Sequence, residues 1–377
     1  MKNVYLDHAA TSPMHPDVIC RMTDVMNNYY GNPSSLHQFG RATRKIIDDC
    51  RRIISREINA QPQEVIFTSG GTESNNIVLR SVTATQKHLG KHMITTAIEH
   101  PSVLDTYAEL EKEGWQVTYL PVSEQGAIAI EDLIAALTDE TILVSIMAVN
   151  NETGVLQPID QVASVLADHQ SFFHVDSVQA FGRSLIDVVA LGVDFLTASA
   201  HKINGPKGAG LLYVKNGTPL VSLTYGGEQE RNRRAGTENV AGVSGFAKAV
   251  EVYQSCRAEY SANAIALREA FLSELQDIDY WLNTDLSQSS PHILNVSFPN
   301  VCQESLLTNL DLAGIAVSSG SACSAGSVSA SHVMVAMFGE GNDRSNNSVR
   351  ISFGLGNTVD EVKWAAQEMK KIVKSLQ

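Results

Sequence analysis

The sequence has no apolar run long enough to cross a membrane. A membrane-spanning helix needs about 18 or more consecutive, mostly apolar residues, and no segment of the 377-residue chain comes near this. The first seven residues also lack the apolar core of a secretory signal. We therefore predict a cytoplasmic protein that does not contact membranes.

Cysteines are few and far apart. The five cysteines lie at positions 20, 50, 256, 302 and 323, and no two of them form a C-x-x-C motif. Zinc clusters and disulfide frameworks use closely or regularly spaced cysteines. The sequence therefore predicts neither a disulfide framework nor a metal site.

Positive charge is also scarce. The chain has 28 Lys and Arg against 41 Asp and Glu, which gives a net charge of −13. Non-specific binding to nucleic acid depends on basic surface that displaces counterions, so we predict no direct nucleic-acid partner. Arg231, Arg233 and Arg234 are the best candidate for a local basic patch.

What the chain does contain is typical of a globular α/β protein. Predicted strands and helices alternate between residues 64 and 214, which favours a mostly parallel sheet. A long helical pattern over 238–275 then leads to a stretch whose strands and helices indicate a smaller α+β domain. We place a large domain at 12–257 and assign 1–11 and 258–377 to the small domain.

Four polar residues stand at the ends of four predicted strands. His100 follows the strand 92–97 and Asn151 follows 142–149, while Asp176 ends 172–176 and Lys202 follows 195–198. Ligands of α/β proteins bind at the carboxyl ends of strands, so we expect these side chains to meet. A lone lysine in such a place is usually a solvated surface residue, and it is the convergence that favours a site.

A glycine turn joins another predicted strand to a helix. After Thr68, the residues Ser69 to Thr72 read Ser-Gly-Gly-Thr and open a helix. Backbone N–H groups at such a start stabilise an anion, so the turn is a candidate phosphate cradle. It lacks the lysine of a Walker loop and the G-x-G-x-x-G pattern of dinucleotide folds. Taken alone, the two glycines are better explained as a turn with a helix cap.

Cys323 lies among tiny residues, in the run from Ser318 to Gly326. This composition is typical of an exposed loop. A free thiol has a pKa of about 8.5 and reacts well only when a cation or a helix N-terminus lowers it. On this evidence Cys323 is either reactive or an inert loop residue, while Cys20, Cys256 and Cys302 have no such setting.

Seven segments together resemble the cysteine desulfurases of the NifS/IscS type. They are Tyr5–Thr11, Gly31–Ser35, Gly71–Asn76, Asn150–Gly154, His174–Gln179, Ser199–Lys202 and Ser321–Cys323. The resemblance spans nearly the whole chain in order, and the motifs are specific only jointly. It implies an enzyme dependent on pyridoxal 5′-phosphate (PLP), of fold type I and related to class V aminotransferases. It also implies a mostly parallel seven-stranded sheet in the large domain, beside a smaller α+β C-terminal domain.

The resemblance also implies roles for the residues at the strand ends. Lys202 would attach PLP and move the substrate Cα proton. Asp176 would pair with the ring nitrogen, and Gln179 with the phenolic oxygen. His100 would stack on the ring and assist proton transfer. Phosphate contacts would come from Gly71, Thr72, Ser199 and His201, and from Thr237 reaching the partner subunit's cofactor in a homodimer.

The substrate implied by the resemblance is L-cysteine. Asn151, which also borders the cofactor, and Arg350 would hold its carboxylate, for which a guanidinium is well shaped. Cys323, in a catalytic loop at about 318–347, would take the sulfur as a persulfide and leave L-alanine.

The sulfur acceptor and two alternative functions stay open. The segment 354–358 reads Gly-Leu-Gly-Asn-Thr, where many members of the family are expected to have Gly-Arg-Phe-Thr. The chain also ends at Gln377, without the extended tail that those members use to engage an iron–sulfur scaffold protein. An iron–sulfur scaffold and a tRNA thiouridylase are therefore equally plausible acceptors. The alternatives are a selenocysteine lyase or another class V aminotransferase-type enzyme, and a non-catalytic sulfur-carrier subunit.

Overall fold

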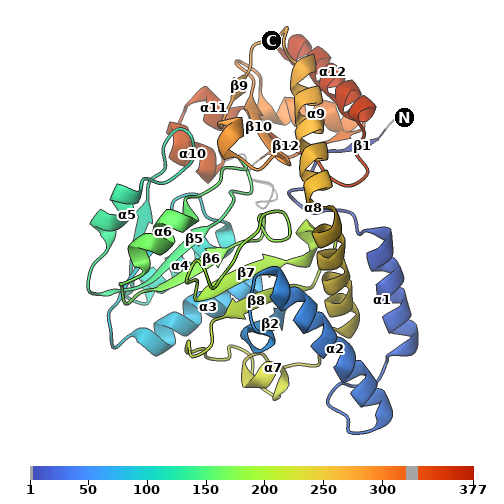
Figure 1. Ribbon diagram of the computed structural model, residues 1–377. Helices are drawn as coiled ribbons and strands as arrows, with labels where there is room; N and C mark the ends of the chain where they lie inside the picture. The colour runs from blue at the N-terminus through green and yellow to red at the C-terminus, as the bar shows by residue number, and fades with distance from the viewer. Residues whose placement is uncertain (1–2, 320–329) are drawn as a thin grey trace.

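A seven-stranded sheet forms the centre of the larger part of the molecule (Figure 1). The computed structural model describes residues 3–319 and 330–377. The strands are β2 (Val65–Thr68), β3 (His92–Thr96), β4 (Gln116–Leu120), β5 (Thr141–Met147), β6 (Phe172–Asp176), β7 (Phe195–Ser199) and β8 (Gly210–Val214). Their order is β2-β8-β7-β6-β5-β3-β4, where β8 runs antiparallel to both neighbours and the other pairs are parallel. The predicted, mostly parallel sheet is confirmed.

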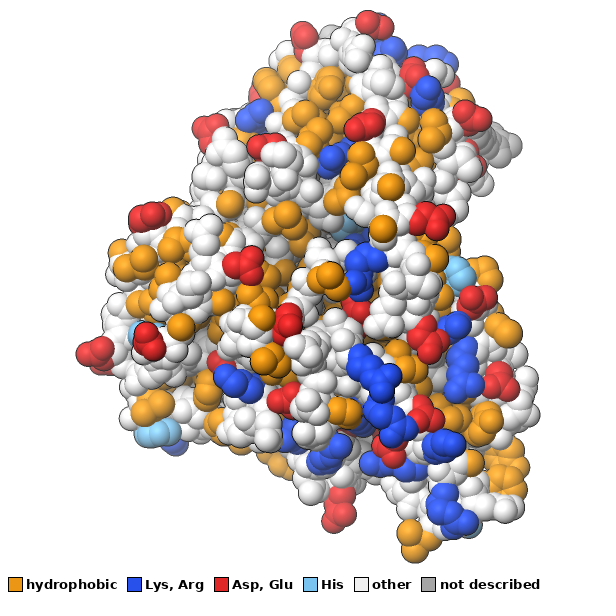
Figure 2. All heavy atoms as spheres, viewed as in Figure 1, with side chains coloured by type: hydrophobic (Ala, Val, Ile, Leu, Met, Phe, Trp, Pro, Cys, Tyr) orange, Lys and Arg blue, Asp and Glu red, His pale blue; other side chains and the backbone are white. Residues whose placement is uncertain are grey.

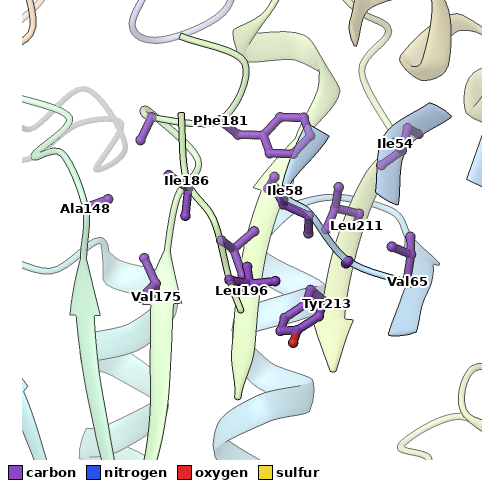
Figure 3. Packing of buried hydrophobic residues seen from close by; sticks show 14 of the residues in the cluster. Ile54, Ile58, Val65, Ala148, Val175, Phe181, Ile186, Leu196, Leu211 and Tyr213 are labelled. Carbon is purple, nitrogen blue, oxygen red and sulfur yellow. The ribbon is translucent and has the colours of Figure 1, made fainter. Parts of the chain in front are cut away.

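Helices cover both faces of this sheet. The helices α3 (Gly71–Gln86) and α4 (Pro101–Lys112) pack on one face. On the other lie α2 (Gln38–Glu57), α5 (Ile130–Ala136), α6 (Ile159–Leu166) and the first half of α8 (Val240–Glu274), with α1 (Pro16–Asn28) against α8. Figure 3 shows Ile54 and Ile58 beside Leu196 and Leu211 in this second core. Strands covered on both faces read as continuous apolar runs, and all seven residues of β5 are buried.

A smaller sheet and its own apolar core make up the rest. Its strands are β9 (Trp281–Leu282), β10 (Ile293–Ser297) and β12 (Ser348–Ser352), in the antiparallel order β12-β10-β9, while β1 (Val4–Tyr5) pairs in parallel with β11 (Ile315–Ala316). The helices α9 (Gln303–Leu312) and α12 (Val359–Leu376) pack here. Because α8 runs unbroken through position 257, Tyr253 lies in the large core and Phe271 in the small one.

Short helices complete the chain, and two of them correct a prediction. They are α7 (Gln229–Asn232), α10 (His332–Phe338), α11 (Asp343–Asn346) and the 3-10 turns η1 (Pro62–Glu64), η2 (Ala200–Lys202) and η3 (Leu286–Gln288). The prediction of a loop through 347 is wrong for α10 and α11. The Ser331 hydroxyl caps α10 by accepting from the backbone N–H groups of Val333 and Met334, and apolar residues of α10 pack on Ile98 and Met147.

The N-terminal segment runs from the small sheet to the large one. Val4 pairs with Ile315, and Asp7 forms a bridge with Ser352 of β12. Farther along, the Ser12 hydroxyl donates to the His201 carbonyl at 2.7 Å. The residues between these contacts therefore lie at the junction of the two sheets.

Charged side chains are mixed over much of the surface. Figure 2 shows Lys and Arg gathered on the face where α2 lies in Figure 1. Of the three arginines predicted as a patch, Arg234 is paired with Glu73 at 2.8 Å, whereas Arg231 is exposed. Within residues 3–319 and 330–377, no helix combines the length and apolar character needed to span a bilayer.

Candidate active site

A cavity of about 270 Å³ lies at the carboxyl ends of β3, β5, β6 and β7. These strands are neighbours in the sheet, so residues that follow them come together. The lining includes ten of the predicted site residues: Gly71, Thr72, His100, Asn151, Asp176, Gln179, Ser199, His201, Lys202 and Arg350. Thr237 is exposed and is not in the lining, and Cys323 lies outside the described residues.

The Asp176 carboxylate is held in place by two donors. Asn75 Nδ2 donates to its Oδ2 at 2.8 Å, and the Val178 backbone N–H donates to its Oδ1 at 3.0 Å. Asn75 stands one turn after Gly71 on α3, which places both residues on the same helix face. It also donates to the Ser102 hydroxyl at 2.9 Å. The carboxylate is thus a fixed acceptor at the cavity wall, and the sequence interpretation had overlooked its support by Asn75.

Two histidines of the lining are neutral near pH 7. His100 caps α4, and its Nδ1 accepts from the Ser102 backbone N–H at 3.1 Å. Burial lowers the pKa of His100, against the opposing effect of the Asp176 charge. Burial, and then the Lys202 charge, lower the pKa of His201 to about 4. Since His100 Nδ1 accepts, its ring carries the proton on Nε2 and presents an uncharged aromatic face.

The start of α3 forms a cradle for an anion. Gly70 precedes the helix without a side-chain cap, so the first backbone N–H groups are open to a ligand. The cradle depends on close backbone approach, because a Cβ on Gly210 would lie 2.5 Å from the Gly70 Cα. Ser199 and His201 add polar groups to the same cavity. This set of donors fits a phosphate.

The Lys202 amine lies against the N-terminal segment. Its Nζ donates to the carbonyls of Ala9 and Ala10 at 2.6 and 2.8 Å. The Gln179 amide donates to the same Ala9 carbonyl at 2.9 Å. From behind, Arg183 Nη2 donates to the Lys202 carbonyl at 2.9 Å. Lys202 is therefore held both at its side-chain amine and at its backbone carbonyl.

Arg350 brings a buried guanidinium to the cavity from the small sheet. Its Nη2 donates to Asp7 Oδ1 at 2.8 Å, and its Nη1 donates to the Asn151 carbonyl at 2.9 Å. The residue is only 3% exposed. Asp7 was not among the predicted site residues, although it follows the first strand directly and lies in the segment Tyr5–Thr11 that resembles the family.

Two buried carboxyl groups lie just outside the cavity and were also missed. Glu152 accepts a hydrogen bond from Ser331, and burial raises its pKa. Burial raises the pKa of Glu99 to about 8, and its backbone carbonyl accepts from His332 Nε2 at 2.9 Å. Both residues adjoin predicted site residues in sequence. They attach the start of α10 to the turns that carry His100 and Asn151.

Cys302 corrects a statement made from the sequence. It is exposed and is the residue before α9. Hydrogen bonds from Ser305 lower the pKa of its thiol. The expectation that Cys302 lacks a setting that lowers its pKa is therefore wrong, because the residue is the N-cap of α9.

The family of the chain follows from comparison with known proteins. A family model described as "Aminotransferase class-V" matches residues 4–364. The chain belongs to this family. A Bacillus subtilis (strain 168) relative named "Putative cysteine desulfurase IscS 1" is 49% identical, and each chain is covered in full.

Solved structures agree with this membership. A structure titled "NIFS-LIKE PROTEIN" has a TM-score of 0.93 and 35% identity, with both chains covered in full. Another, titled "SspA in complex with cysteine", has a TM-score of 0.83 and 32% identity, covering 93% of this chain and 98% of the other. The predicted resemblance and fold type are confirmed.

Members of this class V family are PLP-dependent, and PLP is the cofactor of this chain. The residues present fit the group. The uncapped start of α3 is suited to its phosphate, and the doubly held Asp176 carboxylate is suited to a protonated ring nitrogen. The Lys202 amine borders the same space.

Proposed function

We propose that this class V enzyme is a cysteine desulfurase that converts L-cysteine to L-alanine and passes the sulfur on as a persulfide of Cys323. The observation that carries the proposal is the convergence of Lys202, Asp176 and Arg350 on one cavity. The near-half identity with a relative named as a cysteine desulfurase supports the same reaction.

In this proposal the cofactor is held by residues of the large sheet. Gly71, Thr72, Ser199 and His201 bind its phosphate, and Asp176 binds its ring nitrogen. Gln179 donates to the phenolic oxygen from an amide placed beside the Lys202 amine. His100 covers the ring with its neutral imidazole, and its Nε2–H remains available to donate. Bound PLP withdraws electrons from the substrate Cα, which makes its proton acidic.

Arg350 and Asn151 bind the substrate carboxylate. The buried guanidinium is held by Asp7 and by the Asn151 carbonyl, so its direction is set before the substrate arrives. Pre-set geometry of this kind lowers the cost of ordering the substrate. Arginine suits a carboxylate because its planar donors bind both oxygens.

Lys202 and Cys323 carry out the transfer. The Lys202 amine takes the Cα proton and later returns a proton to the substrate carbon skeleton. The Cys323 thiolate attacks the substrate sulfur, so an S–S bond forms while the bond from sulfur to Cβ breaks. The electron pair of that bond stays with the three-carbon product, which leaves as L-alanine after protonation. His100 assists these proton movements.

We propose that the enzyme works as a homodimer, in which Thr237 reaches the cofactor phosphate of the partner subunit. Thr237 is exposed and lies away from the cavity of its own chain. Its loop is fixed by the buried pair of Arg51 and Glu230 at 2.6 Å, so it is presented outward from a stable base. Light scattering should give twice the 40.8 kDa chain mass, and a monomeric, active enzyme would contradict the proposal.

We further propose that the enzyme is cytoplasmic. We also propose that the chain divides into a large domain, 12–257, and a small domain formed by 1–11 and 258–377. The two separate apolar cores support this division. The enzyme's acceptor is a protein of iron–sulfur cluster assembly or a tRNA thiouridylase. Cell fractionation tests the location, and pull-down with the persulfide-loaded enzyme distinguishes the two acceptors.

The reaction is tested with two variants and mass spectrometry. Cys323→Ser should keep the visible absorption of bound PLP but form neither persulfide nor alanine in excess of the enzyme. Lys202→Ala should lose covalent PLP. After addition of cysteine, the mass of one sulfur atom should appear on Cys323 and not on Cys302, the exposed thiol at a helix start.

Each contrary result has a definite meaning. Full turnover by Cys323→Ser would indicate a selenocysteine lyase or another class V activity. A chain that never acquires the PLP absorption band would indicate a non-catalytic carrier subunit. Sulfur found only on Cys302 would overturn the role of Cys323.

A further inference from the structure

A second cavity lies behind Lys202, at the junction of the two sheets. Its volume is about 140 Å³, and none of its lining residues lines the active site. It is bordered by the turn after Phe181, by α8 and by the segment that leads into β10. Since a water molecule takes about 30 Å³, the space is large enough for a small polyatomic ligand. The lining includes Arg183, Tyr253, Arg257, Tyr260, Ser289 and His292.

This cavity carries a positive charge without a carboxylate to balance it. Arg257 is paired with the buried Glu57. Arg183 forms no ion pair with any residue in 3–319 or 330–377, and the remaining twelve positions contain no Asp or Glu. After burial, the Arg183 charge is the next cause that lowers the pKa of His292. The lining itself includes no acidic residue.

Two buried polar groups beside this charge have no partner in the described part of the chain. They are Arg183 Nε and the Ser289 hydroxyl. Ser289 is only 7% exposed and lines the cavity. Buried donors are nearly always paired in folded proteins, because leaving them unpaired costs stability. Tyr260 adds a further donor, since burial raises the pKa of its phenol to about 12.

We propose that this junction cavity is a binding site for a small tetrahedral oxyanion of the sulfate or phosphate class. The guanidinium of Arg183 supplies the charge and Ser289 supplies a hydroxyl donor, which together match the donors that such anions take. The anion balances the Arg183 charge, which has no ion-pair partner among the described residues, and satisfies both unpaired donors.

Hydrogen bonds of Arg183 and of His292 connect the proposed anion site to the active site. Arg183 Nη2 donates to the Lys202 carbonyl at 2.9 Å. His292 Nε2 lies 3.4 Å from Gln179 Oε1, and its Nδ1 lies 2.7 Å from the Ser290 hydroxyl. An anion that holds Arg183 therefore also fixes the backbone of the lysine that attaches PLP. It acts as a small-molecule regulator of cofactor geometry.

The test titrates the holoenzyme with sodium sulfate at constant ionic strength, with sodium chloride as the balancing salt. Bound PLP keeps the phosphate cradle filled, so sulfate cannot act there. We expect a saturable rise in the thermal unfolding temperature and a saturable shift of the PLP absorption band. Arg183→Gln should weaken the sulfate affinity at least about tenfold, because one hydrogen bond to a charged group is lost.

Two further variants make the result decisive. Ser289→Ala removes only the buried hydroxyl and should weaken the affinity about three- to tenfold; it carries the test if Arg183→Gln fails to fold. Arg52→Gln lies on the exposed arginine-rich groove of α2 and should leave the affinity unchanged. Equal sulfate binding by Arg183→Gln, Ser289→Ala and the parent would overturn the proposal. So would loss of binding in Arg52→Gln alone, or no saturable effect in the parent.

Discussion

The buried carboxyl group of Glu99 makes the free energy of unfolding depend on pH, and the substitution Glu99→Gln should remove this dependence. Its side chain is 0% exposed. Oε1 accepts from the Met147 backbone N–H at 2.9 Å and from the Thr96 hydroxyl at 2.8 Å, whereas Oε2 has no partner among the described residues. Glu99→Gln keeps the shape and one acceptor oxygen and abolishes the titration.

The size of the effect follows from the raised pKa of Glu99. Burial moves this pKa from an ordinary 4.5 to about 8. Between these values the unfolded chain releases a proton that the folded chain keeps, so rising pH favours unfolding. The contribution of the group to stability is fully present below pH 4.5 and is lost as the pH rises through 8. Integration from pH 5 to pH 8 gives a loss of about 3–4 kcal/mol.

The assay compares denaturant midpoints of the parent and Glu99→Gln holoenzymes at several pH values between 5 and 8. Comparison at the same pH removes the pH dependence of the cofactor from the difference. The variant should gain about 3–4 kcal/mol relative to the parent across this range. Glu124→Gln, at an exposed turn, should show no such trend. A difference between Glu99→Gln and the parent that stays constant with pH would refute the assignment of a bound proton to Glu99.

Three other substitutions test parts of the site. Gly210→Ala places a Cβ 2.5 Å from the Gly70 Cα, which should destabilise the fold by about 1–3 kcal/mol in thermal unfolding and weaken PLP retention on dialysis. Asn75→Ala removes a donor to Asp176 and should lower PLP affinity about tenfold in a spectrophotometric titration; unchanged affinity would contradict its supporting role. Ser331→Ala removes the cap of α10 and should cost about 0.5–2 kcal/mol in chemical denaturation.

Much of the large sheet could be predicted from local pattern. The strand Phe172–Asp176 has the predicted bounds, because an apolar run that ends in a polar residue marks both a strand and its carboxyl end. The meeting of His100, Asn151, Asp176 and Lys202 could be predicted for the same reason. Parallel neighbouring strands bring their ends to one edge of a sheet.

The remaining features depend on residues far apart in the chain. Asp7 meets Arg350 across 343 positions, and no periodicity links two such segments. Whether Glu99 is buried or solvated depends on α10, which packs on it from more than 200 residues away. The start of α10 itself follows from a serine cap and from apolar packing on Ile98, and the short helix gave too few turns for a periodic signal.

The path of the N-terminal segment also sets the order in which the protein is completed during synthesis. The carbonyls of Ala9 and Ala10 that receive Lys202 are made 193 and 192 positions before it. Asp7, close by, must wait for Arg350, and at about 5–20 residues per second the interval is tens of seconds. The seven-stranded sheet can therefore form on the ribosome while the Arg350 side of its cavity is still missing. A nascent chain that has not yet made β12 therefore has an incomplete cavity.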